Sequence, residues 1–139
     1  MPNLSDQQRQ IITRGVMRQP QAIVEDTIKL WENLAREISP IIGEVGFESL
    51  YHRSIHLSSA EFPWLASAGK LPPNDSSFAG LRAALQAEDC EKAGEASIAL
   101  LGIFVEIVIR LIGEPLTANI LRAAWSDEIF QPAVKELKA

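Results

Sequence analysis

The residue types best suited to chemistry in this 139-residue chain gather in one short stretch. Two acids, two histidines and an arginine follow one another there: Glu44, Glu48, His52, Arg53 and His56. A step of four residues turns a helix by only about 40° beyond a full turn, so the acids and histidines share one slowly drifting edge. Imidazoles and carboxylates at this spacing could bind a metal ion, and an imidazole could accept a phosphoryl group.

A metal site is the first interpretation of this edge. It would use His52 and His56 as ligands one turn apart, with a carboxylate as a further ligand. The string HRSIH lacks the glutamate of the HExxH zinc motif. Glu48 stands four residues before His52, whereas di-iron bundles use a spacing of three. We therefore expect no metal and no cofactor.

A phosphoacceptor histidine is the second interpretation. Histidine phosphotransfer domains are acidic helical bundles of similar size, and this chain resembles them in carrying His56 or His52 in the middle of a helix. In those domains a lysine and a small residue follow the histidine, whereas Leu57-Ser58-Ser59 follows His56. Signalling through His56 or His52 is therefore the alternative function. The simplest interpretation is a solvated helix edge with weak intrahelical pairs.

The elements that must position these residues are helices, and the stretch from Gly94 to Gly113 is the most informative of them. At about 100° per residue, its apolar side chains cover about three-quarters of the circumference. Such a helix must be buried on at least two sides. The sequence therefore predicts an all-α fold, a compact bundle of five to six helices around a buried central helix over about residues 90–112. The apolar block from Ile98 to Ile112 is shorter than the roughly 20 residues that a membrane span needs.

A narrow polar stripe runs along this central helix. Ala99 and Gly102 are small enough to let another helix, or a second copy of the same helix, come close. Glu106 and Arg110 follow on the same stripe, one turn apart. The stripe fits an i,i+4 ion pair at the surface, the contact of a homodimer, or the polar floor of a pocket.

Prolines and glycines mark the expected helix ends, and no run alternates as a strand would. We predict a single helical domain over residues 1–139, with an N-terminal helix within residues 1–19 and a tail over residues 126–139. Further helices are expected from Pro20, from Ser39-Pro40 or Gly46 to about Leu57, from Asn74 or Asp75, from Asp89 to Gly113, and from Pro115.

Residues 58–75 form the one long connection, which we expect to be ordered because it contains the apolar string FPWL. Phe62, Trp64 and Leu65 would plug the core of the bundle. Alternatively, they would form a lid or present an exposed docking site.

One four-residue string is repeated in similar form. Ile41-Ile42-Gly43-Glu44 recurs as Leu111-Ile112-Gly113-Glu114, and each string precedes an amphipathic helix. The repeat indicates a duplicated helix–joint–helix unit, or it reflects only that glycine ends helices and that glutamate is favourable at the N-terminus of the next helix.

The composition narrows the classes of function. The formal net charge of −5 makes a nucleic-acid partner unfavourable. Cys90 is the only cysteine, and Met1–Gln10 lacks the apolar core of a signal peptide, which together favour a cytoplasmic protein. No membrane association is expected.

The chain shows no phosphate-binding glycine loop, no nucleophile beside a base and no pair of carboxylates at catalytic spacing, so no enzyme is predicted. The sequence predicts a non-enzymatic interaction or regulatory module that acts through protein–protein contacts, as a homodimer. A carrier of a small apolar ligand in the bundle core is the second alternative.

Overall fold

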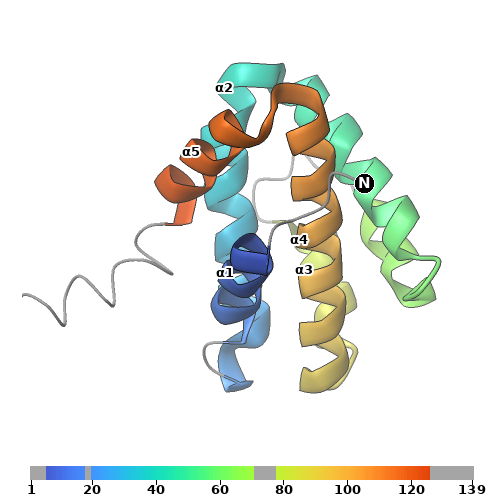
Figure 1. Cartoon of the computed structure of the whole chain (residues 1–139). Helices are drawn as coiled ribbons and strands as arrows, with labels where there is room; N and C mark the ends of the chain where they lie inside the picture. Colours follow the sequence, from blue (N-terminus) through green and yellow to red (C-terminus); the bar gives the residue numbers. More distant parts are fainter. Residues whose placement is uncertain (1–5, 18–19, 71–77, 126–139) are drawn as a thin grey trace, which may run out of the picture.

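The computed structural model describes residues 6–17, 20–70 and 78–125. Over these residues the protein is all-α, as predicted, with five α-helices, two short 3-10 helices and no strand (Figure 1). The elements are α1 (Asp6–Val16), η1 (Pro20–Ala22), α2 (Ile23–Ser58), η2 (Pro63–Lys70), α3 (Ala79–Gln86), α4 (Cys90–Ile112) and α5 (Glu114–Trp125). None of these helices has the length and apolar character that crossing a membrane would require.

The predicted central helix is α4, and it is buried on several sides. It packs against α1, α2 and α5, and it contributes eleven buried residues. Its start is fixed by Asp89, whose side-chain oxygen accepts a hydrogen bond of 2.8 Å from the backbone N–H of Lys92. An aspartate in this position satisfies one of the free N–H groups of the first turn. Gly113 ends the helix, as the sequence predicted.

The predicted boundary between the second and third helices is wrong. We expected it at Ser39-Pro40 or Gly46, but α2 continues through Pro40 and bends at Gly43, where φ is 85° and ψ is 160°. Pro40 lies three residues before the bend and lacks the N–H that would donate to the backbone oxygen of Arg36. The bend falls at Gly43 because these backbone angles are open to glycine almost alone. Thus α2 consists of two arms, residues 23–42 and residues 44–58.

The joint between α4 and α5 repeats this bend. Gly113 has φ 93° and ψ 159°, nearly the angles of Gly43. We call these two turns the elbows. In Figure 1 both elbows lie at the top of the molecule: α2 rises to one and returns, and α4 rises to the other and returns as α5. The two glycines are 70 positions apart in the sequence.

The same offset of 70 relates the buried positions of the two halves. Eleven residues of α2 from Ile23 to Ile55 are buried. For ten of them, the residue 70 positions later in α4 or α5 is also buried. The exception is Ile28, whose equivalent, Ile98, is half-buried. The ten pairs are Ile23 with Ala93, Thr27 with Ser97, Leu30 with Leu100, Trp31 with Leu101, Leu34 with Phe104, Ile38 with Val108, Phe47 with Thr117, Tyr51 with Leu121, Ser54 with Ala124, and Ile55 with Trp125. In the reverse direction, six buried residues of α4 and α5 fall on residues of α2 that are not buried. The equal joints and the shared part of the burial pattern support a duplicated helix–glycine–helix unit.

Aromatic rings fill the space between the two halves. The indole ring of Trp31 lies with its centroid between 5.1 and 6.5 Å from the rings of Phe47, Tyr51, Phe78 and Phe104. Burial raises the pKa of the Tyr51 hydroxyl well above its ordinary value, so this group stays neutral. On the other side, Trp125 Nε1 donates a hydrogen bond of 3.0 Å to the backbone oxygen of Leu30, which holds α5 against the first arm of α2.

The helix before α4 begins at Ala79, with Phe78 at the cap position in a left-handed conformation (φ 52°). Phe78 is buried in the aromatic core, which holds this unfavourable backbone in place. An ion pair between Arg82 and Glu25 joins α3 to α2. The predicted caps Asn74 and Asp75 lie outside the described residues, as does the tail over residues 126–139.

The elbows generate the first prediction. Replacing Gly43 or Gly113 with alanine should lower the free energy of unfolding by about 1–3 kcal/mol, because alanine is strained at these angles. The cost is one of backbone conformation, since an added Cβ at Gly43 meets nothing within 4 Å and at Gly113 only Pro115 Cδ at 3.9 Å. Urea unfolding followed by circular dichroism measures the change.

Gly46 is the matched control, because it lies in the same helix without positive φ and its added Cβ comes no closer than 3.4 Å to Ile42. Gly46→Ala should be neutral or stabilising by up to about 1 kcal/mol. Equal effects of all three substitutions would contradict the elbow assignment.

Candidate functional site

The histidine edge lies on the second arm of α2 and faces solvent. Glu44, His52, Arg53 and His56 are exposed, and Glu48 is half-buried. Across residues 6–17, 20–70 and 78–125, no three His, Cys, Asp or Glu side chains come together as a metal-binding group. The arrangement is that of a solvated helix edge. Phosphotransfer through His52 or His56 stays a prediction.

The polar stripe of α4 is only partly accessible. Gly102 is buried, Ala99 and Glu106 are half-buried, and Arg110 is exposed. Because Gly102 already packs inside the protein, a second copy could not use it for a close helix–helix contact without opening the bundle. The burial of Gly102 argues against a close contact at this position, and the homodimer stays a prediction.

The FPWL segment consists of Phe62 and the first three residues of η2, which packs against α2 and α3. Leu65 is fully buried, whereas Phe62 and Trp64 are half-buried and lie edge to face with ring centroids 6.1 Å apart. Both aromatic side chains pack on the hydrophobic core. The segment thus packs as a plug whose anchor is Leu65, the first of the two arrangements that the sequence left open.

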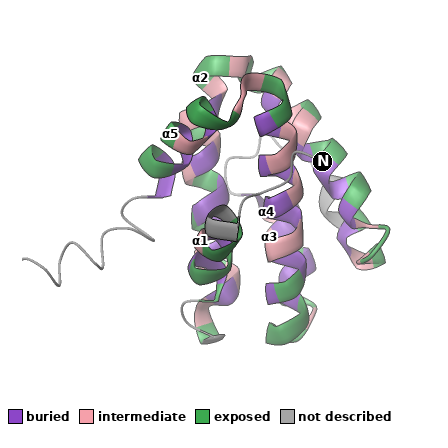
Figure 2. Cartoon of the chain, viewed as in Figure 1, coloured by how far each residue is buried: buried purple, intermediate pink, exposed green. Residues whose placement is uncertain are grey.

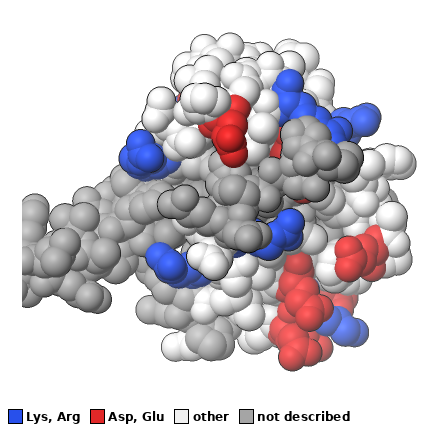
Figure 3. Space-filling model, in the orientation of Figure 1, with Lys and Arg blue, Asp and Glu red and all other residues white. Residues whose placement is uncertain are grey.

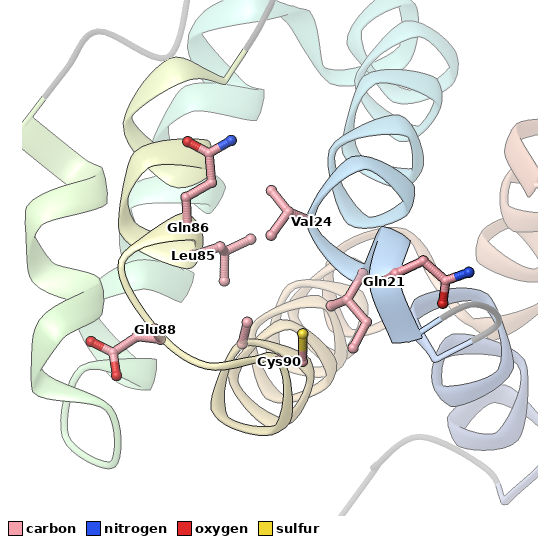
Figure 4. A pocket seen from close by; sticks show the side chains of 8 residues that line it. Gln21, Val24, Leu85, Gln86, Glu88 and Cys90 are labelled. Carbon is pink, nitrogen blue, oxygen red and sulfur yellow. The ribbon is translucent and has the colours of Figure 1, made fainter.

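A small pocket opens at the end of the bundle away from the elbows, where α2 and α4 begin (Figure 4). Its volume is about 220 Å³, and its walls come from η1, α2, α3 and α4. Gln21, Val24, Leu85, Gln86, Glu88 and the exposed Cys90 are among its lining residues. Pockets for small molecules usually measure about 300–1,000 Å³, so this hollow gives weak support to the ligand carrier.

The site that the sequence analysis missed lies on the elbows. Among the described residues, six large apolar side chains are strongly exposed, and four of them flank the two glycines. These four are Ile41 (47% exposed), Val45 (77%), Leu111 (57%) and Leu116 (41%), which we call the elbow surface. The sequence held a signal for this surface, because Ile41 and Leu111 are the first residues of the two similar strings IIGE and LIGE. The apolar helical pattern nevertheless predicts that Leu111 is buried.

The surroundings of the elbow surface are sparsely charged. Pro40 and Pro115 beside it are exposed, and its nearest acids are Glu44 and Glu114. In Figure 3 the topmost surface of the molecule is uncharged, and acidic and basic side chains lie just below it. Figure 2 shows the same end exposed or half-buried, above a buried interior. Each elbow therefore presents two large apolar side chains to solvent, at the same end of the bundle.

No family model, no curated protein and no solved structure matches this chain. The function must therefore be argued from the geometry of the chain itself.

The plug generates a second prediction. Leu65→Ala should cost about 2–5 kcal/mol of unfolding free energy, because the side chain is fully buried. Trp64→Ala should cost less than the roughly 3–5 kcal/mol of a fully buried tryptophan, since its ring is half-buried. Chemical denaturation of both variants measures which one loses more unfolding free energy. A larger loss for Trp64→Ala would make the indole the anchor.

The histidine edge should be chemically quiet. No lysine lies between residues 44 and 60 to steady a phosphoryl group, so acetyl phosphate should leave no acid-labile phosphate on the protein. Intact-mass spectrometry before and after mild acid measures this. A labelled species that is lost in His56→Ala or His52→Ala would instead establish the phosphotransfer function.

Proposed function

We propose that this protein is a non-enzymatic interaction module that binds another protein chain through its elbow surface. The observation that carries the proposal is the grouping of Ile41, Val45, Leu111 and Leu116 at one end of the bundle. Single exposed apolar residues are ordinary on protein surfaces, but a contiguous group of them marks an interaction site. A role in regulation follows from such binding without any chemistry of its own.

The backbone of the elbows supports this assignment. Both turns have glycine backbone angles and join helices that pack in the bundle, so the fold places the four residues beside the turns at the end of the bundle. By contrast, the histidine edge is polar and exposed, and the pocket beside Cys90 is small.

Site-specific photo-crosslinking in the source cells tests the proposal. A photoreactive residue replaces Val45 in one variant, Leu111 in a second and Leu57 in a third. Leu57 is the control because it is 42% exposed and lies at the far end of the second arm of α2. We expect one covalent protein adduct, identified by mass spectrometry, from positions 45 and 111 and none from position 57.

Equal adducts at all three positions, or none at positions 45 and 111, would contradict the proposal. Circular dichroism of each variant checks that the helices are retained, so that a missing adduct reports on the surface and not on folding.

A further inference from the structure

We infer that the chain docked on the elbow surface is a second copy of this protein, in a two-fold dimer; this inference rests on the proposed function. The sequence predicted a homodimer through Ala99 and Gly102, and the burial of Gly102 argues against that contact. The elbow surface offers a different one. Three features of that surface select a second copy as its occupant: its internal repeat, its size and its charges.

The internal repeat relates the two elbows in part. Ile41 with Glu44 on one elbow corresponds to Leu111 with Glu114 on the other at the offset of 70, whereas Val45 falls on Pro115 and Leu116 on Gly46. The most common closed assembly is a two-fold dimer, in which the same patch is used by both subunits. In such a dimer the equivalent apolar positions Ile41 and Leu111 of one copy face the same positions of the other.

The size of the surface fits a weak dimer. Side chains exposed from 41% to 77% at four positions make a patch in the range of roughly 300–600 Å², the largest that monomers usually show. A standard interface buries about 800 Å² on each partner. The elbow surface and its rim therefore support a reversible dimer and not an obligate one. Each subunit already has its own core, so dissociation leaves a folded monomer.

The charges around the elbows allow the elbow surfaces of two copies to face each other. The exposed side chains Glu44 and Glu114 are acidic, and Arg110, also exposed, lies one turn before Glu114. A rim of a single sign would repel its own copy, whereas a rim with both signs lets acidic and basic groups of two copies approach. The remaining exposed large apolar residues, Met17 and Leu57, lie on other parts of the chain.

Sedimentation equilibrium of the full chain over the micromolar range tests the inference. We expect the mass to rise from 15.3 kDa toward twice that value with concentration. Leu116→Asp should weaken the association at least tenfold, because it places a charge in the apolar contact. The substitution lies in the first turn of α5, where an acid is tolerated by the helix.

Leu57→Asp is the matched control, since Leu57 and Leu116 are 42% and 41% exposed and undergo the same chemical change. It should leave the dissociation constant unchanged. Val45→Asp, in the most exposed position of the surface, should repeat the effect of Leu116→Asp. Circular dichroism confirms that each variant is folded.

A constant mass of 15.3 kDa at every concentration overturns the inference, as does equal weakening by Leu57→Asp. Dissociation by Ala99→Arg but not by Leu116→Asp or Val45→Asp would move the contact to α4 and also overturn it. The crosslinking experiment separates the two claims. A monomer whose position 45 crosslinks to a different protein keeps the interaction module and loses only the second copy.

Discussion

Two glycines hold backbone angles that other residues adopt only with strain, and the arrangement of the helices depends on them. At Gly43 and at Gly113 the chain leaves one helix and enters the next with φ near 90° and ψ near 160°. Each turn folds an arm back toward the bundle, so that α2 and the pair α4–α5 can pack on one another. The turns also expose the residues beside them, because side chains at a sharp bend lie beyond the reach of the core.

The core follows from this geometry. When two equal bent units pack together, the positions that face inward in one unit face inward in the other, which the matched pairs from Ile23 with Ala93 to Ile55 with Trp125 show. The side chains have diverged within this register. At equivalent positions, Trp31 in one half corresponds to Leu101 in the other, and Leu34 corresponds to Phe104.

Helical periodicity was enough to predict the fold class and the buried central helix. Two local features escaped it. The boundary in α2 was placed at Pro40 or Gly46, because proline and glycine are common at helix ends, but the decisive property is a positive φ, which only the backbone reveals. Phe78 was expected within a helix, and its left-handed cap position depends on burial among rings that are distant in sequence.

The candidate site was harder to predict than the fold for a physical reason. Periodicity shows which side of a helix is apolar, but not where the neighbouring helices stop. Leu111 shares the apolar pattern of α4 with Leu100 and Phe104, yet it is exposed because the bundle ends at the elbow. The four residues of the elbow surface therefore have the apolar side chains typical of a core, but they lie on the surface. Selection for solubility alone would favour polar residues at such ends, and the proposed contact with another chain accounts for their apolar character.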